Sequence, residues 1–360
     1  MPQPITHYLV IEEALTDAAR NLWEKYRNFA AFGSFGPDLF YVKDVLLARF
    51  DPKQNYEALS DALHGDGSFD LFCALLDQAK DNQRRDPEAA GKQLAFALGY
   101  YSHVLTDCIL HPYVYRRTQD HWKYHVPKED YTAHKKLEAM IDCHILKEKH
   151  RKEAVPDASA VRCRQENNGD LLDMDIASVL NNALKTVYSA VLSADFQTLD
   201  INQPEHPIHA AYHDFHHIVG TTYAAQNILC GLREYFAGLD MLKQLNAADI
   251  QARNVSKGPW RPNGDSAELT YSSSELFAMA VWATKQVASI ALAFWTGDPG
   301  SGNAQSVFRQ NGIAYLRENW NLDTGLPARF NADPAIFDRG EQRYNVGVDV
   351  LRDVYAGLTK

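Results

Sequence analysis

The stretch Leu94–Pro112, LAFALGYYSHVLTDCILHP, decides the fold class of this chain. It is apolar for most of its length, but His103, Asp107 and His111 interrupt it at positions i, i+4 and i+8. Successive members of such a series differ by about 40° around an α-helix, so the three polar side chains share one face. Burying imidazole and carboxylate groups costs free energy unless they are paired or bind a metal ion. The stretch therefore predicts a buried helix that carries metal ligands.

A second predicted helix, within Ala133–Ile145 (AHKKLEAMIDCHI), has His134 and Glu138 one turn apart. A histidine and a carboxylate at this spacing form half of a zinc site. A lone pair of this kind also occurs on solvated helices. The recurrence on two helices, one of which is otherwise apolar, favours metal binding.

The spacing divides these ligands between two ions. His103 and Asp107 are one turn apart and can bind a single ion, whereas His111 lies roughly 12 Å along the axis from His103. We therefore expect His111 to serve a neighbouring ion together with His134 and Glu138. Three protein ligands leave an open coordination position, which is typical of a catalytic rather than a structural zinc.

The rest of the chain shows the same helical periodicity and few alternating runs, so the expected fold class is all-α. Pro112 disfavours helical geometry in the residue before it, so we expect its helix to end at His111, at the mouth of the site. The predicted helices cover residues 5–30, 55–63, 69–83, 88–111, 129–149, 171–194, 206–238, 240–252, 272–296, 303–317 and 343–357.

Two stretches, 153–170 and 253–270, are expected to be loops because they combine Gly, Pro and Asn with little periodicity. The first gives the better domain boundary. We expect a metal-binding domain over residues 1–155 and a helical C-terminal region over 156–360, which either folds separately or shares the same core. The Gly-rich stretch 297–306 lacks the Lys-Ser/Thr of a P-loop and is expected to be a turn.

Composition excludes some classes of protein. The 360 residues are 46% hydrophobic and 23% charged, which is typical of a globular chain. The formal net charge of −10 argues against an extended nucleic-acid surface. Lys285 and Gln286 interrupt Ser274–Trp295, so we expect a buried core helix there rather than a transmembrane segment.

The number and spacing of the cysteines indicate the cellular compartment of the protein. The number of cysteines is odd and no CxxC unit occurs, so free thiols in a reducing compartment are expected. The first residues, MPQPITHYLVIEEAL, lack the features of a signal peptide. We therefore expect a cytoplasmic protein. Its composition is also compatible with an oligomer. The cysteines are Cys73, Cys108, Cys143, Cys163 and Cys230.

The metal-ligand stretches resemble one known family. The run GYYSHVLTDCILHPYVY, followed by HKKLEAMID, resembles the zinc-dependent phospholipase C family, which is related in fold to the S1/P1 nucleases. THYLVIEEAL, FGPDLFY and LHGDGSFDLFCALLDQA resemble further segments of it, so the likeness covers about residues 5–145 in family order. The spacing of three between Asp107 and His111 resembles the branch with glycosylphosphatidylinositol phospholipase D-like domains. The family implies an all-helical fold with up to three zinc ions in a cleft.

The resemblance also implies a ligand set. One zinc would be held by Asp38, His64, His103 and Asp107, and a second by His111, His134 and Glu138. Asp107 would bridge to a third, with His7 as its other side-chain ligand. Secreted members supply backbone atoms of an N-terminal tryptophan to the third ion, whereas six residues precede His7 here. Two or three zinc ions are therefore expected.

Other readings of the less specific ligands stay open. His7 lies on a helix that is also compatible with simple amphipathicity. Asp38 follows Gly36-Pro37 and is also compatible with a turn or helix-capping role. His64 precedes Gly65 and is also compatible with a C-terminal helix histidine favoured by the dipole.

The expected chemistry is hydrolysis of a phosphodiester, because clustered zinc ions neutralise phosphoryl oxygens and activate water. In-line attack on phosphorus by metal-activated water is the hypothesis, with Asp38 as the catalytic residue that orients or deprotonates that water. Asp142 is either a support for a ligand histidine or a surface carboxylate. Nearby aromatic residues either line a headgroup pocket or belong to the core; Tyr41 and Tyr101 are the predicted substrate-binding residues.

A second histidine group lies in EHPIHAAYHDFHHIVG, where three members are spaced i, i+4, i+8. A second metal site, an interior polar network and a wall of the main cleft are all compatible with it. Its members are His206, His209, His213, His216 and His217.

The function expected from the sequence is a zinc-dependent hydrolase of phosphodiesters, acting on a phospholipid headgroup or a related small phosphate ester. An S1/P1-like nuclease or a phosphatase is the alternative enzyme. A metal-stabilised interaction protein is the alternative outside enzymes, and it would have every coordination position filled by side chains.

Overall fold

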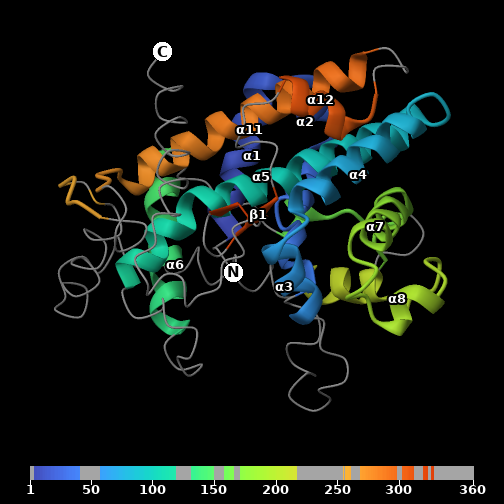
Figure 1. Ribbon diagram of the computed structural model, residues 1–360, viewed down its shortest axis with the longest axis horizontal. Helices are drawn as coiled ribbons and strands as arrows, with labels where there is room; N and C mark the ends of the chain where they lie inside the picture. Colours follow the sequence, from blue (N-terminus) through green and yellow to red (C-terminus); the bar gives the residue numbers. More distant parts are fainter. Residues whose placement is uncertain are drawn as a thin grey trace.

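The fold is organised around the long helix α5 (Pro87–Thr118), which contains the apolar stretch with its three spaced polar residues. In the computed structural model, α2, α4, α1 and α11 pack along α5 (Figure 1). The structure describes residues 4–40, 57–118, 131–149, 158–165, 171–216, 254, 256–260, 268–297, 302–311, 319–322 and 326–327.

The described elements are helical almost throughout, which confirms the predicted all-α fold class. The one sheet in the described part of the chain is an antiparallel pair of two-residue strands, β1 (Trp320–Asn321) and β2 (Leu326–Pro327). Besides α5, the helices whose full extent the structure describes are α1 (Pro4–Ala18), α2 (Arg20–Gly33), η1 (Gly36–Phe40), α3 (Glu57–Gly65), α4 (Ser68–Asn82), α6 (Tyr131–Glu148), η3 (Ala158–Val161), α7 (Met174–Val187), α8 (Ala194–Thr198), α11 (Ser273–Thr296) and α12 (Ala304–Asn311). Residues 207–216 are helical as well.

Local start signals account for several helix boundaries. The Asp86 carboxylate accepts from the Ala89 backbone N–H at 3.0 Å, and Pro87 begins α5 as a first helical residue should. Ser272 and Glu275 form a reciprocal capping box at the start of α11. These pairs satisfy N–H groups that the first turn of a helix leaves without intrahelical partners.

Two predicted helices are interrupted in the structure. The single helix predicted over 5–30 is wrong, because the chain leaves helical geometry at Ala19 (φ −149°, ψ 49°) between α1 and α2. The helix predicted over 171–194 ends at Val187, and α8 follows separately. The break at Ala19 lets α1 and α2 pack on each other as well as on α5. The helices predicted over 240–252 and 343–357 lie outside the described residues.

The predicted end of the central helix at His111 is also wrong. Helix α5 continues to Thr118 with Pro112 inside it. A proline in a helix interior costs about 3 kcal/mol, because it removes a backbone hydrogen bond and crowds the preceding turn. Tyr113 and Val114 beyond it are fully buried, and their burial opposes that cost. His111 is consequently buried among helices instead of lying at a helix end.

Helices α2 and α5 approach each other backbone to backbone. A Cβ atom added at Gly33 would lie 2.2 Å from the Phe96 carbonyl oxygen, and one at Gly99 would lie 2.0 Å from the Ala30 carbonyl oxygen. Only glycine fits at both positions. The close approach brings the end of α2, and the Ser34 carbonyl after it, next to α5.

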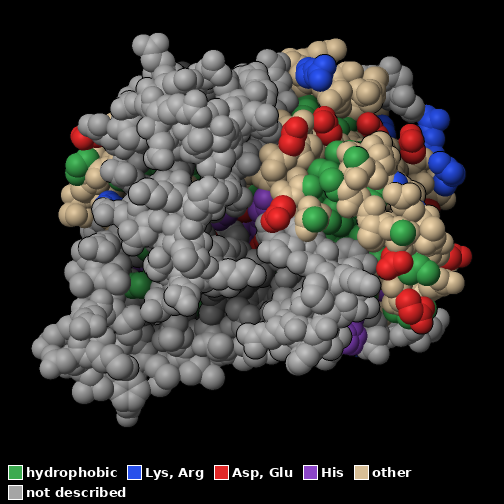
Figure 2. All heavy atoms as spheres, turned by 60° about the horizontal axis from the view of Figure 1, so that its bottom comes forward, with side chains coloured by type: hydrophobic (Ala, Val, Ile, Leu, Met, Phe, Trp, Pro, Cys, Tyr) green, Lys and Arg blue, Asp and Glu red, His purple; other side chains and the backbone are tan. Residues whose placement is uncertain are grey.

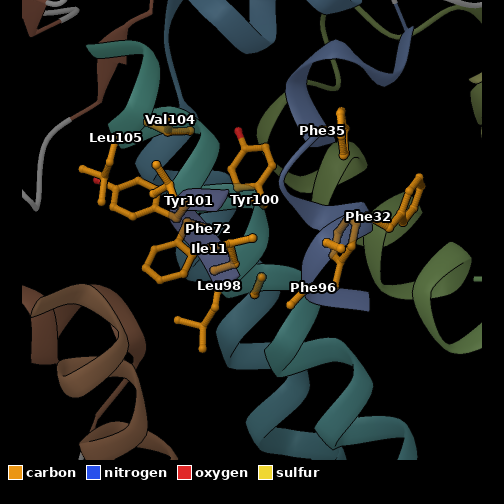
Figure 3. Close-up of a cluster of buried hydrophobic side chains, with 14 of the residues drawn as sticks. Ile11, Phe32, Phe35, Phe72, Phe96, Leu98, Tyr100, Tyr101, Val104 and Leu105 are labelled. Carbon is orange, nitrogen blue, oxygen red and sulfur yellow. The ribbon is translucent and has the colours of Figure 1, made fainter. Parts of the chain in front are cut away.

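A shared apolar core surrounds these helices, and Figure 3 shows part of it, with Phe72 beside Tyr101 in one group and Phe32 beside Phe96 in another. The core also includes residues of α7 and α11, so the C-terminal helices pack on the N-terminal ones. The domain boundary at residue 155 stays a prediction.

Helix α11 (Ser273–Thr296) is the one described helix long and apolar enough to cross a membrane. It packs against α1 and α5, and 56% of its most apolar window is buried. Core helices of globular proteins have the same composition, and this packing agrees with the core helix expected over residues 274–295.

The cysteines differ from expectation. Cys143 is disulfide-bonded. Cys73, Cys108 and Cys163 are free and buried. The expectation of free thiols throughout is therefore wrong for Cys143. Disulfides persist in oxidising compartments, so the cytoplasmic location loses its main support and stays a prediction.

Candidate metal centre

The first group of ligand-type residues joins three elements. Asp38 lies in the turn η1, His64 in the last turn of α3 and His103 in α5. Their ligand atoms lie within 4.8 Å of one another, and all three residues are buried. The Asp38 Oδ1 atom is 3.2 Å from His64 Nε2. The geometry matches what one metal ion requires of three side chains.

A second group shares His103 with the first. His7, His103 and Asp107 also bring their ligand atoms within 4.8 Å of one another. The Asp107 carboxylate lies between the two imidazoles, with Oδ1 3.2 Å from His7 Nε2 and Oδ2 3.0 Å from His103 Nε2. The two rings stack at 4.0 Å between centroids, so both Nε2 atoms face the same carboxylate.

His111 extends the cluster one turn further along α5. Its Nε2 atom lies 3.5 Å from Glu138 Oε1 on α6 and 3.8 Å from Asp107 Oδ1. Asp107 therefore lies between the His103 side and the His111 side of the cluster. His134 is on α6 one turn before Glu138, and its side chain is not among those that the structure describes.

Three of the histidines are held in the orientation that a metal ligand needs. The Nδ1 atom of His103 is 2.8 Å from the Ser34 carbonyl oxygen, and that of His64 is 2.8 Å from the carbonyl oxygen of Ser60. The Nδ1 atom of His111 is 2.7 Å from the Leu322 carbonyl oxygen. A backbone carbonyl can only accept, so Nδ1 carries the proton and Nε2 keeps its lone pair for a metal.

The cluster contains buried polar atoms that no described protein group satisfies. Both nitrogens of His7, Nε2 of His103, Oδ1 of Asp38 and both carboxylate oxygens of Asp107 are buried without a hydrogen-bond partner in the described part of the chain. Leaving so many groups unsatisfied is costly. The nitrogen and carboxylate oxygen donors are those that zinc prefers, so the residues fit this metal.

The electrostatics favour ionised carboxylates. Burial by itself raises the pKa of Asp38, but the neighbouring imidazoles of His103 and His64 outweigh it and lower the pKa to about 2. Burial likewise opposes ionisation of Asp107, yet three neighbouring histidines hold its pKa well below the usual range. Burial, and then the charge of His103, lower the pKa of His7 and favour its neutral, metal-binding form.

Asp142 anchors the helix that carries His7. It is buried on α6, and its carboxylate accepts from the backbone N–H of Ile5 at 3.0 Å and of Thr6 at 2.9 Å, and from the Thr6 hydroxyl. It thereby caps the start of α1. Asp142 is therefore not the surface carboxylate of the second predicted role, while a supporting role beside a ligand histidine stays a prediction. Burial, ahead of the charge of Glu138, raises its pKa to about 7.

A small pocket lies beside the cluster. It has a volume of about 20 Å³, enough for one water molecule or ion, and Asp107, His111 and Glu138 contribute to its lining with apolar residues of α5 and α6. Histidine side chains are visible in a hollow near the centre of the face shown in Figure 2. The pocket provides space next to the second predicted ion.

Tyr101, one of the two predicted substrate-binding tyrosines, is not among the residues that line this pocket. Tyr101 is fully buried and stacks on Phe72 with 4.3 Å between ring centroids. This position in the core does not favour a headgroup-binding role. Tyr41 lies outside the described residues.

Among the residues that the structure describes, the members of the second histidine group do not gather around one point. His206 and His209 are buried, whereas His213 is exposed beside Asp214. The His206 Nδ1 atom accepts from the Ile208 N–H, and His209 Nε2 lies 2.8 Å from the Ile201 carbonyl oxygen. The metal-type groups in the described residues include none of these histidines. His216 is half-buried, and His217 lies outside the described residues.

No sequence pattern indicated the groups that orient the ligands. The carbonyls of Ser34, Ser60 and Leu322 are backbone atoms that every residue possesses, so no residue type marks them. Asn319, described below, was also missed. A signal for it does exist, because Gly67 at the start of α4 has no side chain with which to cap that helix.

Together, fold and site define an all-α protein with a buried histidine–carboxylate cluster suited to zinc. A family model described as zinc dependent phospholipase C matches residues 6–190, just over half of the 360-residue chain. The chain therefore belongs to the zinc-dependent phospholipase C family, whose activity is that of a zinc-dependent hydrolase. Comparisons with curated proteins and with solved structures gave no match. The finer relationships to S1/P1 nucleases and to glycosylphosphatidylinositol phospholipase D-like domains stay predictions.

Proposed function

We propose that this protein hydrolyses phosphodiester bonds of phospholipids or related small phosphate esters at the buried cluster. The observation that carries the proposal is the orientation of His64, His103 and His111, each with Nδ1 at a backbone carbonyl. Their Nε2 atoms consequently face Asp38, Asp107 and Glu138. Such preorganised ligands are expected of a site that must hold metal ions throughout a reaction.

The ligands are divided between the ions as their spacing and the family resemblance imply. Asp38, His64, His103 and Asp107 would hold one zinc ion; His111, His134 and Glu138 would hold a second. His7, whose Nε2 atom is 3.2 Å from Asp107 Oδ1, is the side-chain candidate for a third. Bound zinc ions would neutralise phosphoryl oxygens and lower the pKa of a water molecule.

The protein's own groups orient and support this chemistry. Asp38 is the residue we assign to orienting the attacking water, because its Oδ1 atom is directed into the first group and has no other partner among the described residues. Asp107 lies among the imidazoles of His7, His103 and His111 and would fix the spacing of the ions. The burial of both carboxylates excludes bulk water and strengthens their interaction with cations.

Two other functions are compatible with the same donors. An S1/P1-like nuclease or a phosphatase would use similar ions on a different phosphate ester. A metal-stabilised interaction protein would bind zinc without turnover. The pocket beside Asp107, His111 and Glu138 supports an enzyme over this last function, because it leaves room for a water molecule at the cluster.

The test is zinc analysis combined with a substrate screen. The full chain would be loaded with zinc, its metal content measured, and hydrolysis followed on phosphatidylcholine vesicles, bis(p-nitrophenyl) phosphate, p-nitrophenyl phosphate and single-stranded DNA. We expect two or three zinc ions per chain and release of phosphorylated headgroup. Activity should disappear on chelation and return with zinc.

The other outcomes of the screen distinguish between the alternative functions. Preferential hydrolysis of the phosphomonoester indicates a phosphatase, and preferential cleavage of DNA indicates a nuclease. Full zinc loading without turnover of any of the four substrates would overturn the assignment as an enzyme.

A further inference from the structure

A short segment near the C-terminus lies against the metal centre. Residues 319–322, Asn-Trp-Asn-Leu, which we call the C-terminal strap, follow the family-matched residues 6–190 by a long stretch of chain. Within the strap, β1 (Trp320–Asn321) contacts α3 and α5. These are the helices that carry His64 and His111.

The peptide groups of Leu322 connect the two sides of the cluster. The Leu322 backbone N–H donates to the His64 carbonyl oxygen at 2.7 Å. The Leu322 carbonyl oxygen accepts from His111 Nδ1, also at 2.7 Å. The leucine side chain is itself fully buried. One residue of the strap thus holds the backbone of a ligand assigned to the first ion and the ring of a ligand assigned to the second.

Asn319 fixes the strap to the start of α4. Its Oδ1 atom accepts from the backbone N–H groups of Phe69 at 2.9 Å and Asp70 at 3.1 Å, and its Nδ2 group donates to Asp70 Oδ2 at 2.9 Å. Gly67 precedes α4 in a left-handed conformation (φ 87°) and offers no capping side chain. Asn319 therefore supplies the helix cap that the local sequence lacks.

We infer that the C-terminal strap strengthens zinc binding at the metal centre, with Leu322 as a positioning residue for the ligands of both predicted ions. The inference rests on the proposed function only in taking His64 and His111 as zinc ligands. The carbonyl of Leu322 sets the His111 tautomer, as partners of metal-bound histidines do. Loss of such partners typically weakens metal affinity about 10- to 100-fold. The family-matched region alone would accordingly bind zinc less tightly than the full chain.

Exchanging the side chains of Asn319 and Asp70 tests whether the contact between the C-terminal strap and α4 supports zinc binding. Asn319→Asp keeps the acceptor for α4 but places a carboxylate against Asp70, so the strap should be released. The double variant Asn319→Asp/Asp70→Asn restores a donor–acceptor pair, and Asp70→Asn alone is the matched control. We expect zinc affinity, measured by chelator competition, to fall at least about tenfold in Asn319→Asp only. Similar zinc affinity in Asn319→Asp and the wild type would overturn the inference.

Two further measurements do not depend on that variant. Leu322→Pro has no amide hydrogen and deletes the bond to the His64 carbonyl, so a folded Leu322→Pro protein should also bind zinc more weakly. In the wild-type chain, zinc should slow hydrogen exchange of the peptide covering residues 319–327; unchanged exchange contradicts the inference. All these readouts are made without substrate. A wild type that binds zinc but hydrolyses no phosphodiester would refute the proposed function and leave the result on the strap intact.

Discussion

Replacing Gly99 by alanine should separate α2 from α5 and weaken the metal centre. The added Cβ atom would lie 2.0 Å from the Ala30 carbonyl oxygen and 2.9 Å from the Cα atom of Gly33. Both neighbours are backbone atoms of a packed helix, so no side-chain rotation relieves the contact. A carbon–oxygen contact normally needs about 3.3 Å or more, so the helices must move apart by roughly 1 Å.

The expected change in the free energy of unfolding of Gly99→Ala follows from two opposing effects. Overpacking a close-packed interface costs about 1–3 kcal/mol, and a contact between two backbones belongs at the upper end of this range. Alanine favours the helix over glycine by about 1 kcal/mol. We expect the free energy of unfolding to fall by about 2 kcal/mol. Zinc affinity should fall about tenfold as well, because His103, one turn after Gly99, donates to the Ser34 carbonyl at the end of α2.

The assay is urea unfolding of the zinc-free protein combined with chelator competition for zinc. Gly65→Ala is the matched control, since a Cβ atom at Gly65, the last residue of α3, meets nothing within 4 Å. The control should change the free energy of unfolding by less than about 1 kcal/mol. A Gly99→Ala protein as stable as the control would refute the reasoning about the helix contact.

Three more predictions concern single side chains. Asp107→Asn removes the charge that faces His103 and should abolish zinc-dependent hydrolysis and lower zinc content; an unchanged rate would contradict the assignment. Burial lowers the pKa of His206 from 6.5 to about 4, so the unfolded chain takes up a proton first as the pH falls. The free energy of unfolding should therefore decline between pH 6.5 and 4, by at most about 3 kcal/mol from this residue, and His206→Gln should show a shallower decline in urea titrations. Asp142→Ala leaves the buried N–H groups of Ile5 and Thr6 without acceptors and should destabilise the protein by about 2–4 kcal/mol in thermal or urea unfolding; a loss below about 1 kcal/mol would show that the anchor of α1 is dispensable.

Much of the cluster was predictable because helical spacing is local. His103, Asp107 and His111 share a face in any α-helix, and the structure places their side chains in one buried cluster as that spacing requires. The same reasoning from the residue before Pro112 was wrong. A proline disfavours helical geometry in the residue before it, but the burial of Tyr113 and Val114 outweighs that local preference and α5 continues. The outcome depends on tertiary packing, which the local sequence does not show.

The all-helical class, the family and the types of ligand follow from the amino-acid sequence, because periodicity and motif spacing are properties of neighbouring residues. How those ligands are held depends on tertiary contacts. Gly33 and Gly99 bring α2 onto α5, and Leu322 brings a backbone carbonyl to His111 from 211 positions away in the chain. A backbone carbonyl has no residue type to mark it, so only folding could show that the segment around Leu322 belongs to the metal centre first indicated by Leu94–Pro112.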